Sequence, residues 1–496
     1  MGTEESQGGE LFWRRKGKTS ELTLNIHGFN IMIASFYADR CGQKQAFLQL
    51  CLLLCVLLTS CAQKPFGPVP SAAQLEWQQM EYNMFVHFGP NTFSGMEWGE
   101  GTEAEDIFNP TDLDCRQWAA TASAAGMRGI IVTAKHHDGF CLWPNPESTH
   151  TVAQSNWRDG QGDVLADLSA ACREYGLKFG VYISPWDRND PTYGTQEYND
   201  KFIRTLQNVH DGRYGQIFEQ WFDGACGEGP TGRKQGYDWP AFNRTVLSLS
   251  PKAVIFSDVG PGCRWVGNER GIACETNWST LDVEGFTPGA GAPPRDTLQQ
   301  GNVHGFSWVP AEADVSIRPG WFWREGENSL VKTVDQLADI WLTSVGRNSL
   351  LLLNVPPDTR GRIHETDSTR LMEFRTWREK VFGLDFAADA LVRKRHGGRV
   401  LYIDLPEYRC FDLIQLQEDI SLGQRVSGFK IQIQDFDVAL KDHGWLTIAE
   451  GTTIGYKRML PCKPVSARRL RLVITGAKAQ PMIKEFSLFS RAEGQF

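Results

Sequence analysis

Residues that can act as acids, bases or hydrogen-bond donors recur in this 496-residue chain, each time near the end of a short apolar run. His87 follows YNMFV, His136 and His137 follow GIIVTAK, Tyr182 lies in KFGVYIS, and Asp223 comes just after QIFEQW. If these runs are parallel strands, their carboxyl ends form one rim, where barrel enzymes place their active sites. Each residue alone has an ordinary structural explanation, but recurrence at the same end of four strands favours a single site.

Two kinds of site fit these side chains. Three histidines and an aspartate could bind zinc, but His136 and His137 are adjacent. Neighbouring side chains on a strand point to opposite faces, so both line one site only if the strand end twists or breaks. His and Tyr also hydrogen bond to sugar hydroxyls, and the 17 Trp residues offer flat rings for sugar C–H faces. We therefore favour a carbohydrate site, with metal as the alternative.

Glycoside hydrolysis requires two carboxyl groups, which lie about 5–5.5 Å apart in enzymes that retain anomeric configuration. Asp223 is the candidate nucleophile, although an Asp before Gly224 could also cap a turn. The second carboxyl should come from a nearby loop after a strand. The Gly-rich loop after KAVIFSD offers Glu269, in GNERG, and Glu275. Either could instead be an ordinary surface acid.

The elements that must position these residues alternate along the chain. Strands are expected at 82–89, 129–137, 178–184, 216–224, 252–258 and 348–357, and helices at 115–126, 163–176 and 201–215. This alternation predicts a parallel sheet. The roughly 310 residues from 75 to 385 suit a (β/α)8 barrel. A doubly wound sheet is the alternative, but no G-x-G-x-x-G follows the first strand.

The pattern changes near residue 385, where the barrel region 76–385 is expected to end. Beyond it, the segments RVLYIDL, FDLIQLQEDI, GFKIQIQ, WLTIAEG and RRLRLVITG alternate in polarity without a long helix between them. This pattern predicts an all-β sandwich over residues 386–496. Such a domain could bind glycan or brace the barrel. Because the sequence shows no sugar site in it, bracing is the safer expectation.

An apolar run at 46–58 is too short to span a bilayer but is typical of a signal peptide. The tetrapeptide LTSC that follows resembles a bacterial lipobox, in which Cys61 would be lipidated. This predicts a leader over 1–61, a Pro-rich tether over 62–75, and a periplasmic or cell-surface lipoprotein held to a membrane only by lipid. Translation from Met32 would shorten the leader, and a buried apolar helix is the alternative.

The charge and cysteine pattern exclude other classes of protein. The formal net charge of −8 argues against nucleic acid as a general partner, because phosphate binding requires a basic surface. The 12 Cys include no CxxC pair, so no zinc ribbon or thioredoxin-like motif is indicated. Whether any of them form disulfides stays open.

Several segments resemble the α-L-fucosidases of glycoside hydrolase family 29. They are FVHFGP (85–90), KHHDGF (135–140), LKFGVYIS (177–184), WFDGA (221–225) and LLLNVPPDTRG (351–361). KHHDGF with a W-x-D-G motif downstream at this spacing is a specific signature, and the resemblance spans about residues 76–385. The resemblance implies a (β/α)8-like barrel, retention of configuration, no metal and no organic cofactor. The C-terminal region resembles discoidin-like or fucosidase-associated β-sandwich modules.

Carried onto matching positions, the resemblance makes Asp223 the nucleophile. It implies that the residues in contact with fucose or lining its pocket are His87, Glu97, Trp98, His136, His137, Tyr182, Trp221 and Trp321. WVGNERG resembles the branch that prefers α1,3- and α1,4-linked fucose on branched, Lewis-type glycans. In that branch the Glu of the GNE segment is the acid/base, which makes Glu269 the candidate and Glu275 the reserve.

The expected activity is hydrolysis of terminal α-linked fucose from glycans through a fucosyl-enzyme intermediate. Polar neighbours should keep the pKa of Asp223 low, whereas burial or the Asp223 charge should raise the pKa of Glu269. The apolar patch for the fucose methyl group is expected from Phe88, Trp221 and Trp321. A non-catalytic sugar-binding protein is disfavoured because both carboxyls are present, while transfer of fucose to an acceptor sugar stays open.

Overall fold

The computed structural model describes residues 10–16, 19–26, 29–37, 64–289, 291–434 and 444–491. They belong to two compact units that divide after Lys64. In the first unit, an antiparallel sheet contains β1 (Glu10–Lys16), β2 (Thr19–Ile26) and β3 (Phe29–Tyr37). The apolar run at 46–58 and the lipobox Cys61 lie outside the described residues, so the leader stays a prediction. No helix within the described ranges is both long and apolar enough to cross a bilayer.

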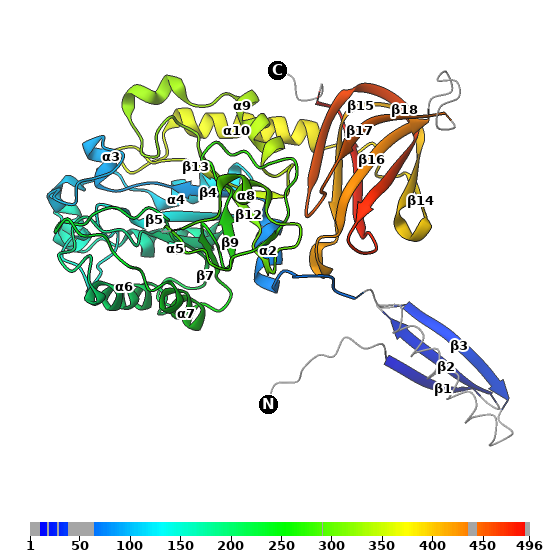
Figure 1. Cartoon of the computed structure of the whole chain (residues 1–496), viewed down its shortest axis with the longest axis horizontal. Helices are drawn as coiled ribbons and strands as arrows, with labels where there is room; N and C mark the ends of the chain where they lie inside the picture. Colours follow the sequence, from blue (N-terminus) through cyan, green and yellow to red (C-terminus); the bar gives the residue numbers. More distant parts are fainter. Residues whose placement is uncertain are drawn as a thin grey trace. The chain divides into compact units, whose positions relative to one another are not determined.

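A closed barrel of eight strands, all paired in parallel, forms the first part of the second unit (Figure 1). This confirms the predicted barrel, and the six expected strands are all present, each shorter than predicted. The strands are β4 (Tyr82–Val86), β5 (Gly129–Lys135), β6 (Lys178–Ile183), β7 (Ile217–Trp221), β8 (Val254–Ser257), β9 (Cys263–Trp265), β12 (Ala311–Ser316) and β13 (Ser349–Asn354).

Helices cover the outside of the barrel, which explains why GIIVTAK and SLLLLN are almost continuously apolar. They are α4 (Cys115–Ala124), α5 (Val164–Glu174), α6 (Gln196–Val209), α7 (Trp239–Leu249), α9 (Val334–Thr343) and α10 (Glu365–Phe382). Three of them begin at an Asp whose side chain accepts a hydrogen bond from a backbone N–H of the first turn, namely Asp114, Asp163 and Asp238.

Helix α6 departs from the expectation of a helix over 201–215, because it begins and ends several residues earlier. Its end is fixed by His210, whose ring turns inward to hydrogen bond with Ser250 Oγ at 2.8 Å and Gln220 Oε1 at 2.9 Å. Residues 211–215, predicted as the last helical turn, form a Gly-containing non-helical turn instead.

A short helix before the barrel, α2 (Ala72–Met80), covers the amino-terminal ends of the strands. Its Gln74 side chain donates to the carbonyl oxygens of Gly262 and Trp308, each at 2.7 Å. Trp77 from the same helix packs among aromatic side chains inside the barrel. Helix α2 therefore closes the amino-terminal end of the barrel and contributes Trp77 to the barrel core.

The barrel is irregular between β8 and β12. Only residues 258–262 join β8 to β9, and they contain no helix. The chain from β9 to β12 is long instead and carries β10 (Thr280–Leu281), α8 (Arg295–Gln300) and β11 (Ser307–Trp308). A further one-turn helix, α3 (Pro90–Ser94), follows β4. The long excursion after β9 contains both candidate acid/base residues.

The C-terminal region forms a six-stranded antiparallel sheet that folds on itself around an apolar core, which confirms the predicted all-β sandwich. Register shifts after Asp404 and Phe411 bend β15, so that two predicted strands are one long bent strand. One half pairs with β14 and the other with β19. The strands are β14 (Leu391–Arg395), β15 (Val400–Glu418), β16 (Val426–Gln434), β17 (Trp445–Gly451), β18 (Arg458–Ala477) and β19 (Ile483–Phe489).

The sandwich holds the chain that follows the candidate acid/base loop. The backbone N–H of Asn277 donates to Thr453 Oγ1 at 2.9 Å, and Gln424 Nε2 donates to the Asn277 carbonyl at 3.0 Å. Gln424 also accepts from the Ser279 N–H at 2.7 Å. From the barrel side, Asn348 Nδ2 donates to the Asn277 carbonyl at 3.1 Å. These contacts suit the bracing role expected of the sandwich.

Candidate active site

The five side chains expected at one rim lie close together at the carboxyl ends of β4 to β7. The Tyr182 hydroxyl donates to Asp223 Oδ2 at 2.9 Å, and His137 Nε2 lies 3.8 Å from the same oxygen. The rings of His87 and His136 have centroids 5.8 Å apart. The structure therefore gathers one carboxylate, three imidazoles and one phenol around a common space.

The adjacent histidines share this space because the strand breaks before them. Strand β5 ends at Lys135, and a register shift between Thr133 and Lys135 disturbs its pairing with β6. Beyond it, the N–H of Gly139 donates to the His136 carbonyl and closes a turn. The imidazole rings of His136 and His137 lie with their centroids 4.1 Å apart. The condition required for both histidines to line one site is thus met.

Hydrogen bonds fix which nitrogen of two pocket histidines carries the proton. His87 Nδ1 lies 2.9 Å from Asn354 Oδ1, which can only accept, so Nδ1 carries the hydrogen. His137 Nδ1 lies 2.8 Å from Ser184 Oγ, whose own proton goes to the Trp186 carbonyl. Burial lowers the pKa of His87 and of His137 to about 3, so both rings are neutral. Their Nε2 atoms are therefore acceptors for hydroxyl protons.

Asp223 receives two hydrogen bonds but retains access to the pocket. The N–H of Ala225 donates to Oδ1 at 2.7 Å, Tyr182 donates to Oδ2, and the side chain is 27 % exposed. Burial nevertheless raises the pKa of Asp223 above its ordinary value, and the two donors only limit the rise. The expectation of a low pKa was wrong, because the barrel removes more water from the carboxylate than two neutral donors replace.

Glu269 lies in the loop after β9, and its pKa is raised as expected for a catalytic acid. Burial is the main cause, and the charges of Asp223 and Glu97 add to it, while a hydrogen bond from the Trp321 side chain opposes it. Glu275 lies elsewhere. Its side chain is 73 % exposed and lies 3.7 Å from Arg347 Nη2, against the sandwich. The geometry therefore favours Glu269 over Glu275 as the partner of Asp223.

Glu97 and Trp98 occupy different places at the pocket mouth. Glu97 accepts from the backbone N–H of Trp321 at 2.6 Å and forms an ion pair with Arg324 at 2.6 Å, so it holds the Trp321 segment in place. Trp98 is 54 % exposed and meets the rings of His137 and Trp186 edge-on. Its exposed ring is available to a ligand that extends beyond the pocket.

Aromatic rings line the pocket, but not all the expected ones. The ring of Trp321 lies 4.9 Å from that of His87, and Trp221 lies 5.2 Å from Tyr182 in a stacked arrangement. Phe88 was expected to meet the fucose methyl group, and this was wrong. Its side chain points away from the barrel interior and packs against Phe108 and Trp118, because it lies on the opposite face of the chain from His87.

Several residues that position the pocket were not predicted from the sequence. Asn354 donates from Nδ2 to the Trp321 carbonyl at 2.8 Å while its Oδ1 holds His87. Lys135 lies 3.0 Å from Asp187 and donates to the Ser184 carbonyl at 2.8 Å, which steadies the chain that holds His137. Asn354 is the last residue of β13, whereas the predicted strand ran on to residue 357, so the strand end that carries this side chain was not recognised.

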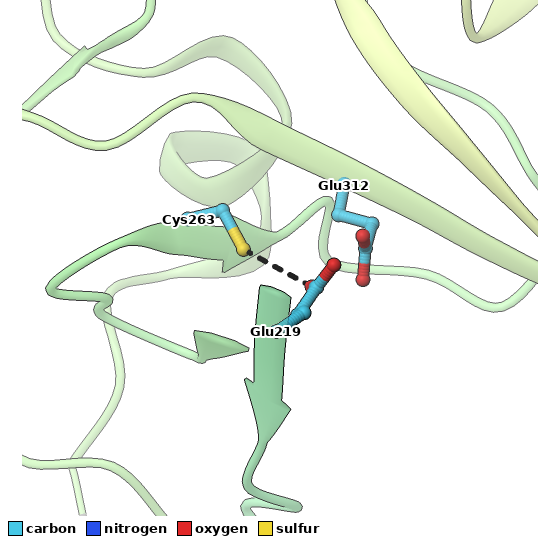
Figure 2. Close-up of side chains that lie close together, drawn as sticks. All are labelled: Glu219, Cys263 and Glu312. Carbon is cyan, nitrogen blue, oxygen red and sulfur yellow. Dashed lines mark hydrogen bonds between the residues drawn. The ribbon is translucent and has the colours of Figure 1, made fainter. Parts of the chain in front are cut away.

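A second group of titratable side chains lies inside the barrel. Figure 2 shows Glu219, Cys263 and Glu312 converging from β7, β9 and β12. One ligand atom from each lies within 4.8 Å of the others, and all three residues are buried. A separate cleft of about 1110 Å³ lies at the amino-terminal ends of the strands, lined by α10 and the sandwich. Neither feature belongs to the rim.

Comparisons with known proteins agree with this site. A family model described as α-L-fucosidase matches residues 66–381. The chain is 39 % identical to α-L-fucosidase 1 of Arabidopsis thaliana over 456 residues, which cover 86 % of this chain and 88 % of that protein. The structure of a glycoside hydrolase 29 family member from an unknown rumen bacterium superposes with a TM-score of 0.80 at 40 % identity, covering 86 % and 78 % of the two chains.

A structure with bound sugar is also similar. The family 29 fucosidase of Ruminococcus gnavus in complex with fucose matches with a TM-score of 0.77 at 30 % identity, covering 86 % of this chain and 96 % of that one.

Replacing Asn354 with Ala removes the acceptor for His87 Nδ1 and the donor to the Trp321 carbonyl. We expect the affinity for L-fucose to fall about tenfold, because two pocket walls lose a hydrogen bond each. Titration calorimetry with L-fucose measures this. Asn208→Ala is the control. Asn208 lies on the outer helix α6, where it accepts one hydrogen bond from Trp143. Equal affinity of both variants and the unchanged protein would contradict the positioning role of Asn354.

Proposed function

Because this chain belongs to the α-L-fucosidase family and hydrolyses α-L-fucosides, we propose that it does so with retention of configuration. Retention requires two successive inversions at the anomeric carbon, with a covalent fucosyl-enzyme between them. The observation that carries the proposal is the pairing of a pocket carboxylate, Asp223, with a loop acid whose pKa is raised, Glu269.

Asp223 is the proposed nucleophile. One lone pair of its carboxylate forms a bond to the anomeric carbon while the bond from that carbon to the glycosidic oxygen breaks. The Ala225 N–H and the Tyr182 hydroxyl hold the carboxylate and leave its remaining lone pairs free to attack. The groups around Asp223 are neutral and exclude part of the water. The Asp223 carboxylate is therefore more reactive as a nucleophile than it would be in water.

Glu269 is the proposed acid/base. In the first step its proton passes to the departing glycosidic oxygen, so the leaving sugar departs as an alcohol. In the second step the resulting carboxylate takes a proton from water, whose oxygen attacks the anomeric carbon and releases Asp223. Its raised pKa favours the protonated form of Glu269 at the start, and the negative charge of Asp223 contributes to that rise.

The remaining rim residues are proposed to bind fucose. The Nε2 atoms of His87 and His137 accept protons from sugar hydroxyls, as their tautomers require. His136 and Tyr182 border the same space, and Trp221 and Trp321 supply apolar surface for the C–H face or the methyl group. A hydroxyl placed between His137 Nε2 and Asp223 would separate two acceptors that otherwise face each other.

We propose α1,3- and α1,4-linked fucose on branched, Lewis-type glycans as the substrate. The support is the position of Glu269 in WVGNERG and the exposed ring of Trp98 at the pocket mouth, where a branching sugar could stack. Fucosyl transfer to an acceptor sugar uses the same intermediate and is distinguished only by which hydroxyl attacks.

Retention and linkage can be tested in one experiment. Lewis-type trisaccharides and 2′-fucosyllactose are incubated separately with the enzyme while proton NMR follows the first fucose released. We expect α-fucose to appear first, and the Lewis-type substrates to react at least about tenfold faster in kcat/KM. Initial release of β-fucose would contradict retention, and faster cleavage of 2′-fucosyllactose would contradict the proposed linkage.

The variant Asp223→Ala tests the nucleophile. Loss of the nucleophile should lower kcat on an aryl α-L-fucoside by at least about 10³-fold while binding of L-fucose persists, because the histidine contacts remain. Turnover close to that of the unchanged enzyme would rule out this role.

Glu269→Ala separates the acid from the nucleophile. We expect a decrease of about 10²–10⁴-fold on substrates with poor leaving groups and a much smaller one on activated aryl fucosides. Azide should restore the rate on the activated substrate, because this anion attacks the anomeric carbon in place of water, releases Asp223 and needs no base to deprotonate it. Glu275→Ala is the matched control from the same loop region and should behave like the unchanged enzyme. If azide rescues Glu275→Ala instead, the assignment to Glu269 is wrong.

We also propose that the chain is exported and anchored through lipid on Cys61. The support is the apolar run at 46–58 followed by LTSC. In a bacterial host, Cys61→Ser should shift the protein from the membrane fraction to the soluble fraction without changing activity. Equal retention of both proteins in washed membranes would speak against lipidation.

A further inference from the structure

Two glutamates lie inside the barrel, below the fucose pocket. Glu219 from β7 and Glu312 from β12 both have no exposed surface. Strand β12 turns Glu312 toward the barrel axis together with Asp314, two residues on. Figure 2 shows the two carboxyl groups beside each other, with the Cys263 thiol adjacent to Glu219. None of these three residues has a part in the mechanism described above.

The hydrogen bonds of this pair are incomplete by one donor. Glu219 Oε2 accepts from Trp77 Nε1 at 2.7 Å, and its Oε1 lies 3.7 Å from the Cys263 thiol, which donates to it. Glu312 Oε1 accepts from Trp221 Nε1 at 2.8 Å. Glu312 Oε2 is buried without a partner. Neither carboxyl forms an ion pair with any residue that the structure describes, so two anions here would be uncompensated.

One proton resolves both problems. Placed on Glu312 Oε2, it donates to Glu219, supplies the missing hydrogen bond and leaves a single negative charge for two carboxyl groups. Burial raises the pKa of both groups, and the mutual repulsion of the carboxylates raises that of Glu312 further. The proton belongs on Glu312 because Glu219 already has two donors. The other titratable groups facing the pair are the Cys263 thiol and, above it, Asp314.

We propose that Glu219 and Glu312 share one proton, and that this pair is a positioning element for the fucose pocket that acts through Trp221. Glu312 holds the indole by its N–H. The ring stacks on Phe256, with centroids 3.8 Å apart and an angle of 8°, and it also contacts the ring of Tyr182 at 5.2 Å. Tyr182 in turn donates to Asp223. The link to catalysis rests on the role proposed for Asp223, whereas the shared proton does not.

A divalent metal is the rival occupant, since a thiol and two carboxyls are possible ligands. The proton fits better for two reasons. Each carboxyl already has one oxygen committed to an indole N–H, and the cluster has no exposed surface through which an ion could enter. An ion would also displace the proton from the thiol, whose pKa is raised well above its ordinary value by burial and by the adjacent glutamates.

The test compares Glu312→Gln with Glu312→Ala. The Gln amide reproduces the protonated acid, because its nitrogen donates to Glu219 and its oxygen accepts from Trp221. We expect kcat within about threefold of the unchanged enzyme for Glu312→Gln, and a decrease of at least about tenfold in kcat, with a smaller change in KM, for Glu312→Ala. Equal, large losses in both variants would overturn the proposal.

Two readouts respond to the proton itself. Difference infrared spectroscopy at neutral pH should show one protonated-carboxyl C=O band fewer in Glu312→Gln than in the unchanged enzyme. Because the pKa of the pair is raised on folding, its contribution to the free energy of unfolding is fully present below the ordinary pKa of glutamate and is lost as pH rises through the raised pKa. The slope of the unfolding free energy against pH gives the number of protons released on unfolding, and this number should be smaller by up to one in Glu312→Gln. Both readouts hold even if Asp223 is not the nucleophile.

Cys263→Ala is the matched control at the same depth. It keeps both glutamates, so the infrared band and the pH dependence of stability should persist. Elemental analysis of the purified enzyme completes the test, with no stoichiometric metal expected. One equivalent of bound metal that disappears in Cys263→Ala, or an infrared spectrum unchanged by Glu312→Gln, would overturn the shared proton. If Glu312→Ala does not fold, the comparison of Glu312→Gln with the unchanged enzyme decides alone.

Discussion

Three carboxyl groups lie inside the barrel and a fourth, that of Glu269, lies in the loop after β9, and the rest of the active site depends on how these four are held. Each of the four receives a hydrogen bond from the side chain of a different tryptophan, in the pairs Trp77–Glu219, Trp221–Glu312, Trp265–Asp314 and Trp321–Glu269. An indole N–H is a neutral donor. It satisfies a carboxyl oxygen in a dry interior without the positive charge that an Arg or Lys would bring. Acids held in this way keep a raised pKa, which proton transfer requires.

Two of the three pocket histidines follow the same rule. The Nδ1 atoms of His87 and His137 are held by the Asn354 amide and the Ser184 hydroxyl instead of by carboxylates, so burial keeps these two rings neutral. Around Asp223 the pocket is therefore lined by neutral donors and acceptors, and the cation Arg324 lies at the pocket mouth, where it is paired with Glu97. Such a site disfavours positive charge on its own histidines in the empty enzyme. Its carboxylates can still stabilise the positive charge that is proposed to develop on a bound sugar ring near Asp223.

The barrel, the rim and the candidate nucleophile could be predicted because polar residues interrupt apolar runs at the same end of four strands. The other side of the barrel could not. Strand β9 has three residues, and AEADVS in β12 buries two acids, so neither resembles a strand of a parallel sheet. Side-chain direction was the second limit, since Phe88 faces outward. The pKa of Asp223 was the third, because the extent of burial depends on the whole barrel.

The segment from Asn277 to Ser279 is held from two sides, by Asn348 of the barrel and by Gln424 and Thr453 of the sandwich. It also continues the loop that carries Glu269. Because this segment is hydrogen bonded to both the barrel and the sandwich, a sequence change in the segment must remain compatible with both domains. Recombination between related genes that exchanged the C-terminal domain alone would separate this loop from half of its anchorage. The loop and the sandwich are therefore expected to be inherited together, so that changes in substrate preference that arise in the loop are accompanied by the matching sandwich.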